Sequence, residues 1–347
     1  MKNKDSKGCK LEGVDTVGGQ AIVEGVMIRS PHAVAMAVRR SNGNIVVKSE
    51  RIKSSPETSI WKKPFFRGIA TLGSTLVLGM KAINFSASIM EEDLRAEEEK
   101  KKEKKLQKKR LFGGKRKTKS KTEKKKKGLS LGELVFSVTV AIGMAIVLYK
   151  VIPLWIAGLA KKASPVFANT VTFNLVDAIV KSLILVFIMW SFSLFKDVRR
   201  MYQYHGAEHM SVFTYEADKK LNVDNAVKYG TLHPRCGTNF LILVFIVSLF
   251  FFLAIDPDLP FVWKLVPRLL LLPIIAGVTY EIIRFGSRHM ENPLVKKLML
   301  PGLWLQKITT RKPDKDQLRV ALEAVKEVLN REKGKAKKAK IFEIEAA

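Results

Sequence analysis

Four long apolar segments in the second half of the chain constrain its fold more than any other feature. They cover about residues 132–157, 171–195, 238–255 and 261–283. An α-helix needs about 20 apolar residues to cross roughly 30 Å of hydrocarbon. The sequence therefore predicts an α-helical polytopic membrane protein with about four transmembrane helices, arranged as two hairpins over residues 129–195 and 238–285.

Several charged residues interrupt these segments. Asp177 and Lys181 are four residues apart and would meet on one face of a helix, so we expect them to form an ion pair. We expect Lys150, Lys264 and Arg268 to extend their side chains toward lipid headgroups. An ion pathway is the alternative. It would make the protein a transporter, which ranks last because the charges lie near the segment ends and no paired repeat of broken helices is evident.

The basic residues predict the orientation in the membrane. Residues 100–127 precede the first apolar segment and hold 17 Lys and Arg against Glu103 and Glu123, a large share of the formal net charge of +29. The loop over 196–237 holds seven basic residues and the loop over 256–260 holds none. Because cytoplasmic flanks carry the excess of basic residues, both termini and the 196–237 loop should be cytoplasmic, in a protein of the cell membrane.

The N-terminal part predicts a small β domain over residues 15–60. Residues 16–31 are apolar on both faces of a period of two, which is typical of a strand buried on both sides. The β-prone runs 33–38 and 45–47 flank a Ser-Asn-Gly-Asn turn at 41–44, which predicts a hairpin.

A helix with an uncertain relation to the membrane follows at residues 61–90. Its uncharged run from Gly68 to Met80 is too short to span the hydrocarbon, so we expect an interfacial or re-entrant helix, with an ordinary buried helix as the alternative. Residues 91–128 are acidic and then Lys-rich, which predicts a solvated linker.

The remaining segments complete the predicted domain organisation. Residues 286–330 are broken by prolines and end in an amphipathic helix, which predicts a cytoplasmic helical region. Residues 1–14 and 331–347 are expected to be disordered tails. The first residues lack the apolar core of a signal peptide.

The Lys-rich linker and the β domain suggest partners. The linker should attract anionic membrane lipids, at about 1 kcal/mol per basic residue near the surface. Either element could also bind a protein partner. Phe112 is the one aromatic residue in the basic tract, so no specific binding of nucleic acid is expected.

The clearest chemical feature is a cluster of histidines in the 196–237 loop. Three of the five histidines of the chain lie between His205 and His233. His205 and His209 lie on one face of a helix, and the string from His205 to His209 fits HxxEH, the inverted zinc-hydrolase motif. In such a motif the imidazoles bind zinc and the neighbouring carboxylate, here Glu208, acts as general base. Two exposed surface histidines are the alternative.

A second pair of potential ligands precedes the third apolar segment. His233 and Cys236 are three residues apart around Pro234. Three imidazole nitrogens and one thiolate match the ligands of a tetrahedral divalent metal, with zinc favoured, although a catalytic site needs only three of them. Alternatively, Cys236 is a small buried apolar residue and His233 a turn residue. With Cys9 as the only other cysteine, no disulfide framework is predicted.

Five stretches of sequence resemble the bacterial DUF1385 family of YqhQ-like membrane proteins. They are GGQAIVEGVMIRSP at 18–31, YHGAEHM at 204–210, TLHPRCGTNF at 231–240, YEIIRF at 280–285 and PGLWLQKITTR at 301–311. The resemblance covers about residues 14–330 without the Lys-rich insert, and it implies a multi-pass, metal-dependent enzyme without an established reaction. Met210 stands where many relatives are expected to have Lys.

The resemblance also implies which polar residues matter. It singles out Glu24, His205, Glu208, His209, Glu216, His233, Arg235 and Cys236. Glu208, Glu24 and Arg235 are thus the catalytic candidates, and His205, His209, His233 and Cys236 the metal ligands.

Two hypotheses use this site. In the first, a membrane-bound metal-dependent hydrolase acts at the cytoplasmic membrane interface on a lipid or a membrane-proximal peptide. In the second, the metal is structural and holds the loop on a membrane scaffold or assembly factor. An ion with four protein ligands would favour the second hypothesis, because no position would be left for water.

Overall fold

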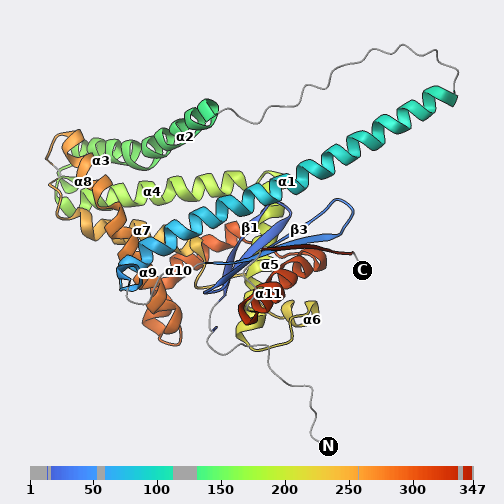
Figure 1. The fold of residues 1–347 in the computed structure, drawn as a ribbon. Coiled ribbons are helices and arrows are strands. Elements are labelled where there is room, and N and C mark those ends of the chain that lie inside the picture. Colours follow the sequence, from blue (N-terminus) through green and yellow to red (C-terminus); the bar gives the residue numbers. More distant parts are fainter. Residues whose placement is uncertain are drawn as a thin grey trace, which may run out of the picture.

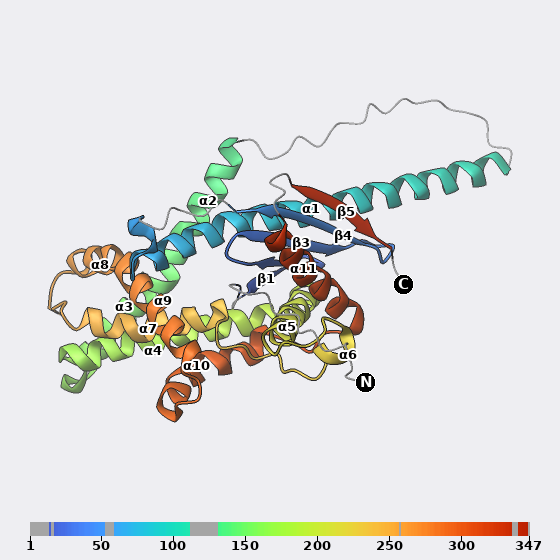
Figure 2. The same cartoon turned by 60° about the horizontal axis from the view of Figure 1, so that its bottom comes forward.

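A bundle of apolar helices and a small antiparallel sheet form the two halves of the molecule (Figure 1). The computed structural model describes residues 14, 17–52, 59–111, 131–256, 258–334 and 339–345. Figure 2 shows that the sheet lies beside α5 (Lys196–Glu216) and α11 (Lys315–Lys333), away from the far ends of the apolar helices. The histidine-bearing α5 therefore lies between the two halves.

The sheet has five antiparallel strands in the order β1-β2-β3-β4-β5. They are β1 (Gly18–Ile22), β2 (Gly25–Arg29), β3 (Ala33–Arg39), β4 (Ile45–Arg51) and β5 (Lys340–Ile344). The predicted hairpin across the 41–44 turn is confirmed as β3 and β4. The single strand predicted over 16–31 is wrong, because the chain folds back at Val23 and Glu24 to make β1 and β2.

The turn at Val23 and Glu24 explains why two strands replace the one that was predicted. Glu24 has a φ of 52°, a left-handed conformation that a tight two-residue turn requires. The strands are nevertheless covered on both faces, as the continuous apolar pattern indicated. One face packs on Leu78, Ala82 and Ile89 of α1 (Phe66–Leu111), and the other on α5 and α11.

The C-terminal segment completes the sheet. Residues 331–347 were expected to be disordered, but β5 pairs with β4, with Ile45 opposite Ile344. An unpaired β4 would expose a row of backbone donors and acceptors, so the alternating residues Lys340–Ile344 satisfy the edge of a strand that is far away in sequence. The tail prediction is therefore wrong for these five residues. The other predicted tail, 1–14, lies almost entirely outside the described residues.

Helix α1 is longer than predicted. It continues from Phe66 to Leu111, across the boundary expected at residue 90. Its acidic and basic second half has residues of high helix propensity and ion pairs four residues apart, such as Glu91 with Arg95, so this part need not be an irregular linker. The rest of the predicted linker, residues 112–128, lies outside the described part of the chain. The first turns of α1 lie against α9 (Leu272–Arg288), where Gly68 approaches Tyr280.

The apolar segments form helices of unequal length. They are α2 (Leu131–Ile146), the π-helix η2 (Val147–Val151), α3 (Ile152–Ala163), α4 (Thr170–Phe192), α7 (Gly237–Phe252), α8 (Phe261–Leu270) and α9 (Leu272–Arg288). Within the described residues, three helices are long and apolar enough to cross a membrane: Phe66–Lys105, Phe136–Ala163 and Thr170–Phe192. The pair α8 and α9, bent by 46°, would make a fourth.

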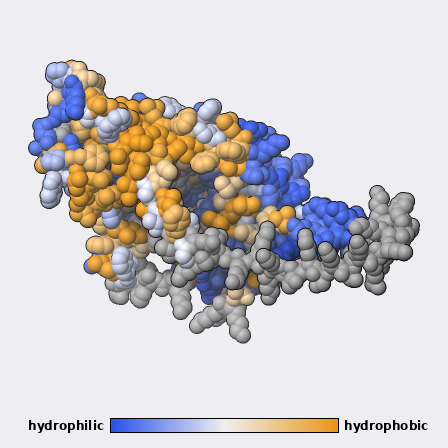
Figure 3. Space-filling view, turned by 90° about the horizontal axis from the view of Figure 1, so that it is seen from above, coloured by the Kyte–Doolittle hydropathy of each residue, from blue (hydrophilic) through white to orange (hydrophobic). Residues whose placement is uncertain are grey.

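The number of helices that could span a membrane agrees with the number predicted from the sequence. They are not the same segments, however. Residues 238–255 have the least interrupted apolar sequence, yet α7 has 16 residues and is shorter than a typical span. Apolar side chains cover much of the surface of the helical half, and hydrophilic ones gather near the sheet (Figure 3). Phe136, Phe187 and Trp263 are among these exposed apolar residues.

Three charged residues within the apolar helices, Asp177, Lys181 and Arg268, are buried. The predicted pair of Asp177 and Lys181 is confirmed, and Arg268 joins it with Nη1 2.9 Å from Asp177 Oδ2. All three residues are at most 2% exposed, so Arg268 does not extend outward as expected. Instead its Nη2 donates to Asn174 Oδ1 at 2.6 Å, and its guanidinium stacks over Phe252. A polar network thus replaces the headgroup contacts predicted for it.

Candidate metal centre

Two histidines of α5 lie side by side as the sequence predicted. His205 and His209 are one helical turn apart, and their ring centroids are 4.5 Å apart. Helix α5 packs on the sheet and on its neighbour α11, which buries Tyr204, Ala207 and Met210 on its apolar face. That packing fixes the direction in which the two imidazoles point.

The turn before α7 brings a third ligand to this pair. Cys236 is the N-cap residue of α7 and accepts a hydrogen bond from the backbone N–H of Thr238. Its Sγ lies 3.2 Å from Nε2 of His205. One potential ligand atom from each of His205, His209 and Cys236 lies within 4.8 Å of the other two. Zinc–ligand bonds of about 2.0–2.3 Å place neighbouring ligand atoms roughly 3–4 Å apart, so small rotations would let these three hold one ion.

Backbone carbonyl groups orient both imidazoles. Nδ1 of His205 lies 2.8 Å from the carbonyl oxygen of Thr309, and Nδ1 of His209 lies 2.5 Å from that of Thr231. A carbonyl only accepts, so each Nδ1 carries the proton and each Nε2 is the nitrogen that presents a lone pair. Metal-binding histidines in proteins are usually held in this way.

His233 lies beside the group but is partnered differently. Its ring centroid is 5.5 Å from that of His209. Its Nε2 is 3.3 Å from Oε2 of Glu216, and its Nδ1 accepts from the backbone N–H of Arg235 at 3.3 Å. Two hydrogen bonds with the side-chain amide of Gln306 fix the backbone of His233. Three of the four predicted ligands therefore come together, and the fourth faces Glu216.

Glu208 is buried between the sheet and the imidazoles. Its Oε2 lies 3.4 Å from Nε2 of His209, and its carboxylate accepts a backbone hydrogen bond from Gly19 of β1. A Cβ atom at Gly19 would lie 3.2 Å from Cγ of Glu208 and would overlap the carbonyl oxygen of Met27, so glycine permits this close approach. Burial raises the pKa of Glu208, although the positive potential of His205, His233 and Arg235 and the Gly19 hydrogen bond oppose the rise.

Burial also sets the charge of the imidazoles. It lowers the pKa of His209 and that of His233, in each case as the largest effect. The thiol of Cys236 opposes that fall for His209, and the charge of Glu208 opposes it for His233. Both rings are therefore neutral at neutral pH, the form in which histidine binds metals.

The two other catalytic candidates make ion pairs. Arg235 pairs with Glu216, which also contacts His233. Glu24 pairs with Arg200 of α5 and accepts from the hydroxyl of Tyr204 at 3.2 Å. Arg235 thus lies at the edge of the histidine group. Glu24 instead joins the β1–β2 turn to α5 at Tyr204, the residue before His205.

Several groups that position the ligands had no predicted role. Arg311 donates its backbone N–H to the carbonyl of Tyr202, and a Cβ atom at Gly206 would overlap the carbonyl oxygen of Arg311. This close approach brings the chain after α10 (Pro293–Thr309) against α5, so that Thr309 can reach His205. The available signal was the PGLWLQKITTR stretch, whose Gln306 and Thr309 contact the site through backbone and amide groups.

Comparison with known proteins places these residues in a family. A sequence model of the family described as "Protein of unknown function (DUF1385)" matches residues 63–331, more than half of the chain. The chain belongs to the DUF1385 family. It is 31% identical over 321 residues to "Uncharacterized protein YqhQ" of Bacillus subtilis (strain 168), a match covering 91% of this chain and 92% of the relative. No solved structure matches the chain. The resemblance of its sequence motifs to DUF1385 is therefore confirmed.

Proposed function

We propose that this DUF1385 member is a membrane-bound, metal-dependent hydrolase that acts at the cytoplasmic membrane interface on a lipid or a membrane-proximal peptide. The observation that carries the proposal is the arrangement of three ligands, His205, His209 and Cys236, beside the buried carboxylate of Glu208. Three protein ligands leave one coordination position for water or substrate, as catalytic zinc sites do.

The helices support a location in the membrane. Three to four of the described helices are long and apolar enough to span it, and their outer faces expose large apolar side chains. Helix α1 suits a re-entrant or interfacial position, because Leu78, Ala82 and Ile89 pack on the sheet while Leu76 and Val77 remain exposed. The basic residues of α5 and of the Lys-rich tract favour the cytoplasmic side for the site and both termini.

The chemistry of the ligands favours zinc. Two imidazoles and one thiol would hold a divalent cation through Nε2 of His205, Nε2 of His209 and Sγ of Cys236. A divalent cation bound there would act as a Lewis acid and lower the pKa of a coordinated water toward neutrality. Thr231 and Thr309 would hold the imidazoles in the required tautomer through their carbonyl groups.

Glu208 suits the role of general base. Its burial raises its pKa toward the range in which a carboxylate can accept a proton at neutral pH and later release it. Its side chain is held by Gly19, so it need not reorganise during the reaction. His233, Glu216 and Arg235 form a charged edge beside it, which could orient an anionic part of the substrate.

A structural metal is the second candidate. It is favoured by the position of His233, whose ring lies near that of His209 and could complete a set of four ligands if Glu216 released it. The ion would then fasten the loop between α5 and α7 to a scaffold or assembly factor. A protein partner on the β domain or on the Lys-rich linker would be recruited by that scaffold.

The Glu208→Gln variant tests the proposal. Protein purified in detergent should contain about one zinc, iron or manganese ion per chain, measured by inductively coupled plasma mass spectrometry. In Glu208→Gln, the metal content and the thermal unfolding midpoint should stay near wild type, while hydrolysis of a lipid or peptide library should fall by about 100-fold or more. Wild-type protein without stoichiometric metal would refute the hydrolase, and so would undiminished turnover in the variant.

A further inference from the structure

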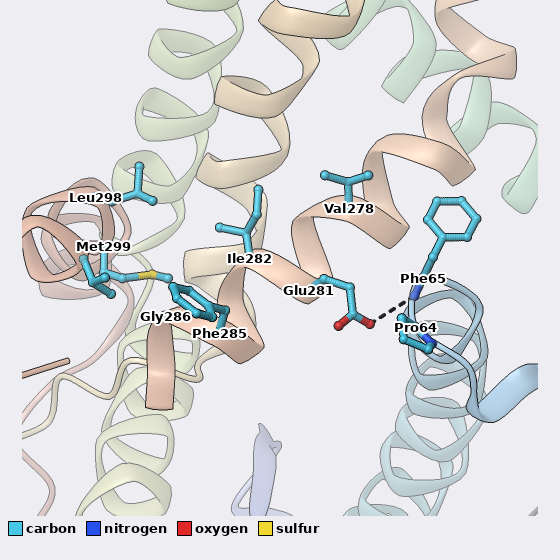
Figure 4. Close-up of a pocket in the computed structure, with 10 residues that line it drawn as sticks. Pro64, Phe65, Val278, Glu281, Ile282, Phe285, Gly286, Leu298 and Met299 are labelled. Carbon is cyan, nitrogen blue, oxygen red and sulfur yellow. Dashed lines mark hydrogen bonds between the residues drawn. The ribbon is translucent and has the colours of Figure 1, made fainter. Parts of the chain in front are cut away.

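An apolar pocket lies between α9, α10 and the segment that leads into α1 (Figure 4). Its volume is about 460 Å³, within the range of small-molecule sites. Its one charged group, Glu281, is occupied, because it pairs with Arg67 and accepts from the backbone N–H of Phe65. The other lining residues are apolar, among them Phe285, Gly286, Leu298 and Met299.

The surface around the pocket is apolar as well. Phe285 and Leu298 line it and are 59% and 48% exposed, and Leu294, one turn before Leu298, is 74% exposed. An exposed apolar surface of this kind is typical of a site that binds another apolar group. A peptide in this pocket would leave backbone N–H and C=O groups without partners, whereas a hydrocarbon chain has no such groups.

The pocket adjoins the candidate metal centre. Met299 lines the pocket, and its sulfur accepts from the side-chain amide of Asn239 at 3.4 Å. The same amide donates to the carbonyl of Pro234 at 2.9 Å, within the turn that carries His233 and Cys236. Helix α10 lines the pocket with its first half and contacts His233 and His205 with Gln306 and Thr309 of its second half.

Two arginines belong to segments that approach Met299, which lines the pocket. Arg288 follows the lining residues Phe285 and Gly286 at the end of α9. A Cβ atom at Gly286 would overlap Cε of Met299, and Arg235 follows Pro234, whose carbonyl accepts from the amide that also contacts Met299. Arg235 also pairs with Glu216. An anion bound by Arg288 and Arg235 would relieve the repulsion between them.

We propose that this pocket holds an acyl chain of an anionic lipid whose phosphate is bound by Arg288 and Arg235, beside Glu208. The inference rests on the proposed function and narrows its substrate to an amphiphile whose phosphate headgroup has a net negative charge. The apolar wall binds the chain, the two guanidinium groups bind the phosphate, and the shared helix α10 keeps both at a fixed distance from His205 and His233.

Lipid retention measured by native mass spectrometry tests the inference without requiring turnover. The protein is purified as Glu208→Gln, so that no bound lipid is consumed, and is mixed with detergent-solubilised phosphatidylglycerol or phosphatidylcholine. Leu298→Trp fills the pocket and should weaken the retention of phosphatidylglycerol by about tenfold or more, since buried CH₂ groups lose their site. Leu294→Trp is the matched control on the same exposed helix face and should retain the lipid.

The headgroup is tested by a third variant. Protein with Arg288 and Arg235 intact should retain more phosphatidylglycerol than phosphatidylcholine. Arg288→Gln should remove most of that difference in retention. Glycerol phosphate, which has the phosphate without the chain, should compete poorly. Equal retention in Leu298→Trp and Leu294→Trp would overturn the acyl pocket, and equal retention of the two lipids by protein with Arg288 would overturn the anionic headgroup. Either result leaves the metal and activity tests of Glu208→Gln unaffected, so the two proposals can fail separately.

Discussion

Nε2 of His205 lies 3.2 Å from Sγ of Cys236, although 31 residues separate them in the sequence. The two residues reach each other because α5 and the first turn of α7 are both held by α10, through Thr309 and Gln306. The contact is a hydrogen bond in the described structure, and its length is also the separation expected of two ligands on one tetrahedral ion. His205 and Cys236 are therefore close enough to bind one metal ion together.

Metal content should distinguish the three grouped ligands from His233. Cys236→Ala or His205→Ala removes one of three ligands, and the metal content should fall to about a tenth of wild type or less. His233→Ala should keep most of its metal, because its Nε2 faces Glu216 and not the other ligand atoms. His289→Ala changes an exposed histidine that stacks on Phe285, and it serves as the control. Loss of metal in His233→Ala equal to that in Cys236→Ala would indicate a four-ligand structural ion.

Gly206 should be essential for the approach of α10 to α5. Alanine usually stabilises a helix relative to glycine by about 1 kcal/mol. At Gly206, however, the added Cβ would overlap the carbonyl oxygen of Arg311, so we expect Gly206→Ala to lower the free energy of unfolding by about 1–3 kcal/mol. It should also weaken metal binding, because the Thr309 carbonyl that orients His205 would move.

Gly230→Ala provides the comparison, since a Cβ atom there would meet no atom within 4 Å. Thermal unfolding in detergent and metal titration would be measured for both variants. The prediction is wrong if Gly206→Ala unfolds and binds metal like Gly230→Ala.

The carboxylate of Asp177 should be essential for the stability that the buried network of Asp177, Lys181 and Arg268 gives the fold. Asp177→Ala leaves two cations without a counter-charge at positions at most 2% exposed, and removal of one partner from such a pair costs about 3–5 kcal/mol. Glu91→Ala breaks an exposed pair with the same four-residue spacing and should cost less than about 0.5 kcal/mol. Unfolding of the two variants by denaturant would be compared, and similar losses would contradict the structural role of the network.

The sequence predicted those elements of the fold that are determined by residues close together in the chain. The hairpin of β3 and β4 follows from alternation and a turn, and the pairing of His205 with His209 follows from the period of a helix. The β1–β2 turn was missed because apolar residues continue on both sides of it, and the positive φ at Glu24 has no Gly or Asn to indicate it. Apolar periodicity cannot locate such a turn.

Features that depend on distant residues were not predictable. The strand β5 exists because β4 offers an unpaired edge almost 300 residues earlier in the chain. The position of His233 depends on Gln306, and the direction of the imidazoles depends on backbone carbonyl groups, which carry no signature in the sequence. The identity of candidate ligands could therefore be predicted, but their division into three grouped residues and one separate residue could not.

Cysteine accessibility in intact cells should determine the orientation of the site. The predicted orientation places the turn between α3 and α4 outside the cytoplasm and the loop after α5 inside it. Val166 of that turn is 64% exposed and Lys219 of the loop is exposed, so each accepts a cysteine without loss of buried contacts. In a background carrying Cys9→Ser and Cys236→Ser, a membrane-impermeant maleimide should label Val166→Cys in intact cells, and Lys219→Cys only after lysis. Labelling of Lys219→Cys in intact cells would move the histidine group to the outer face, where a cytoplasmic lipid substrate could not reach it.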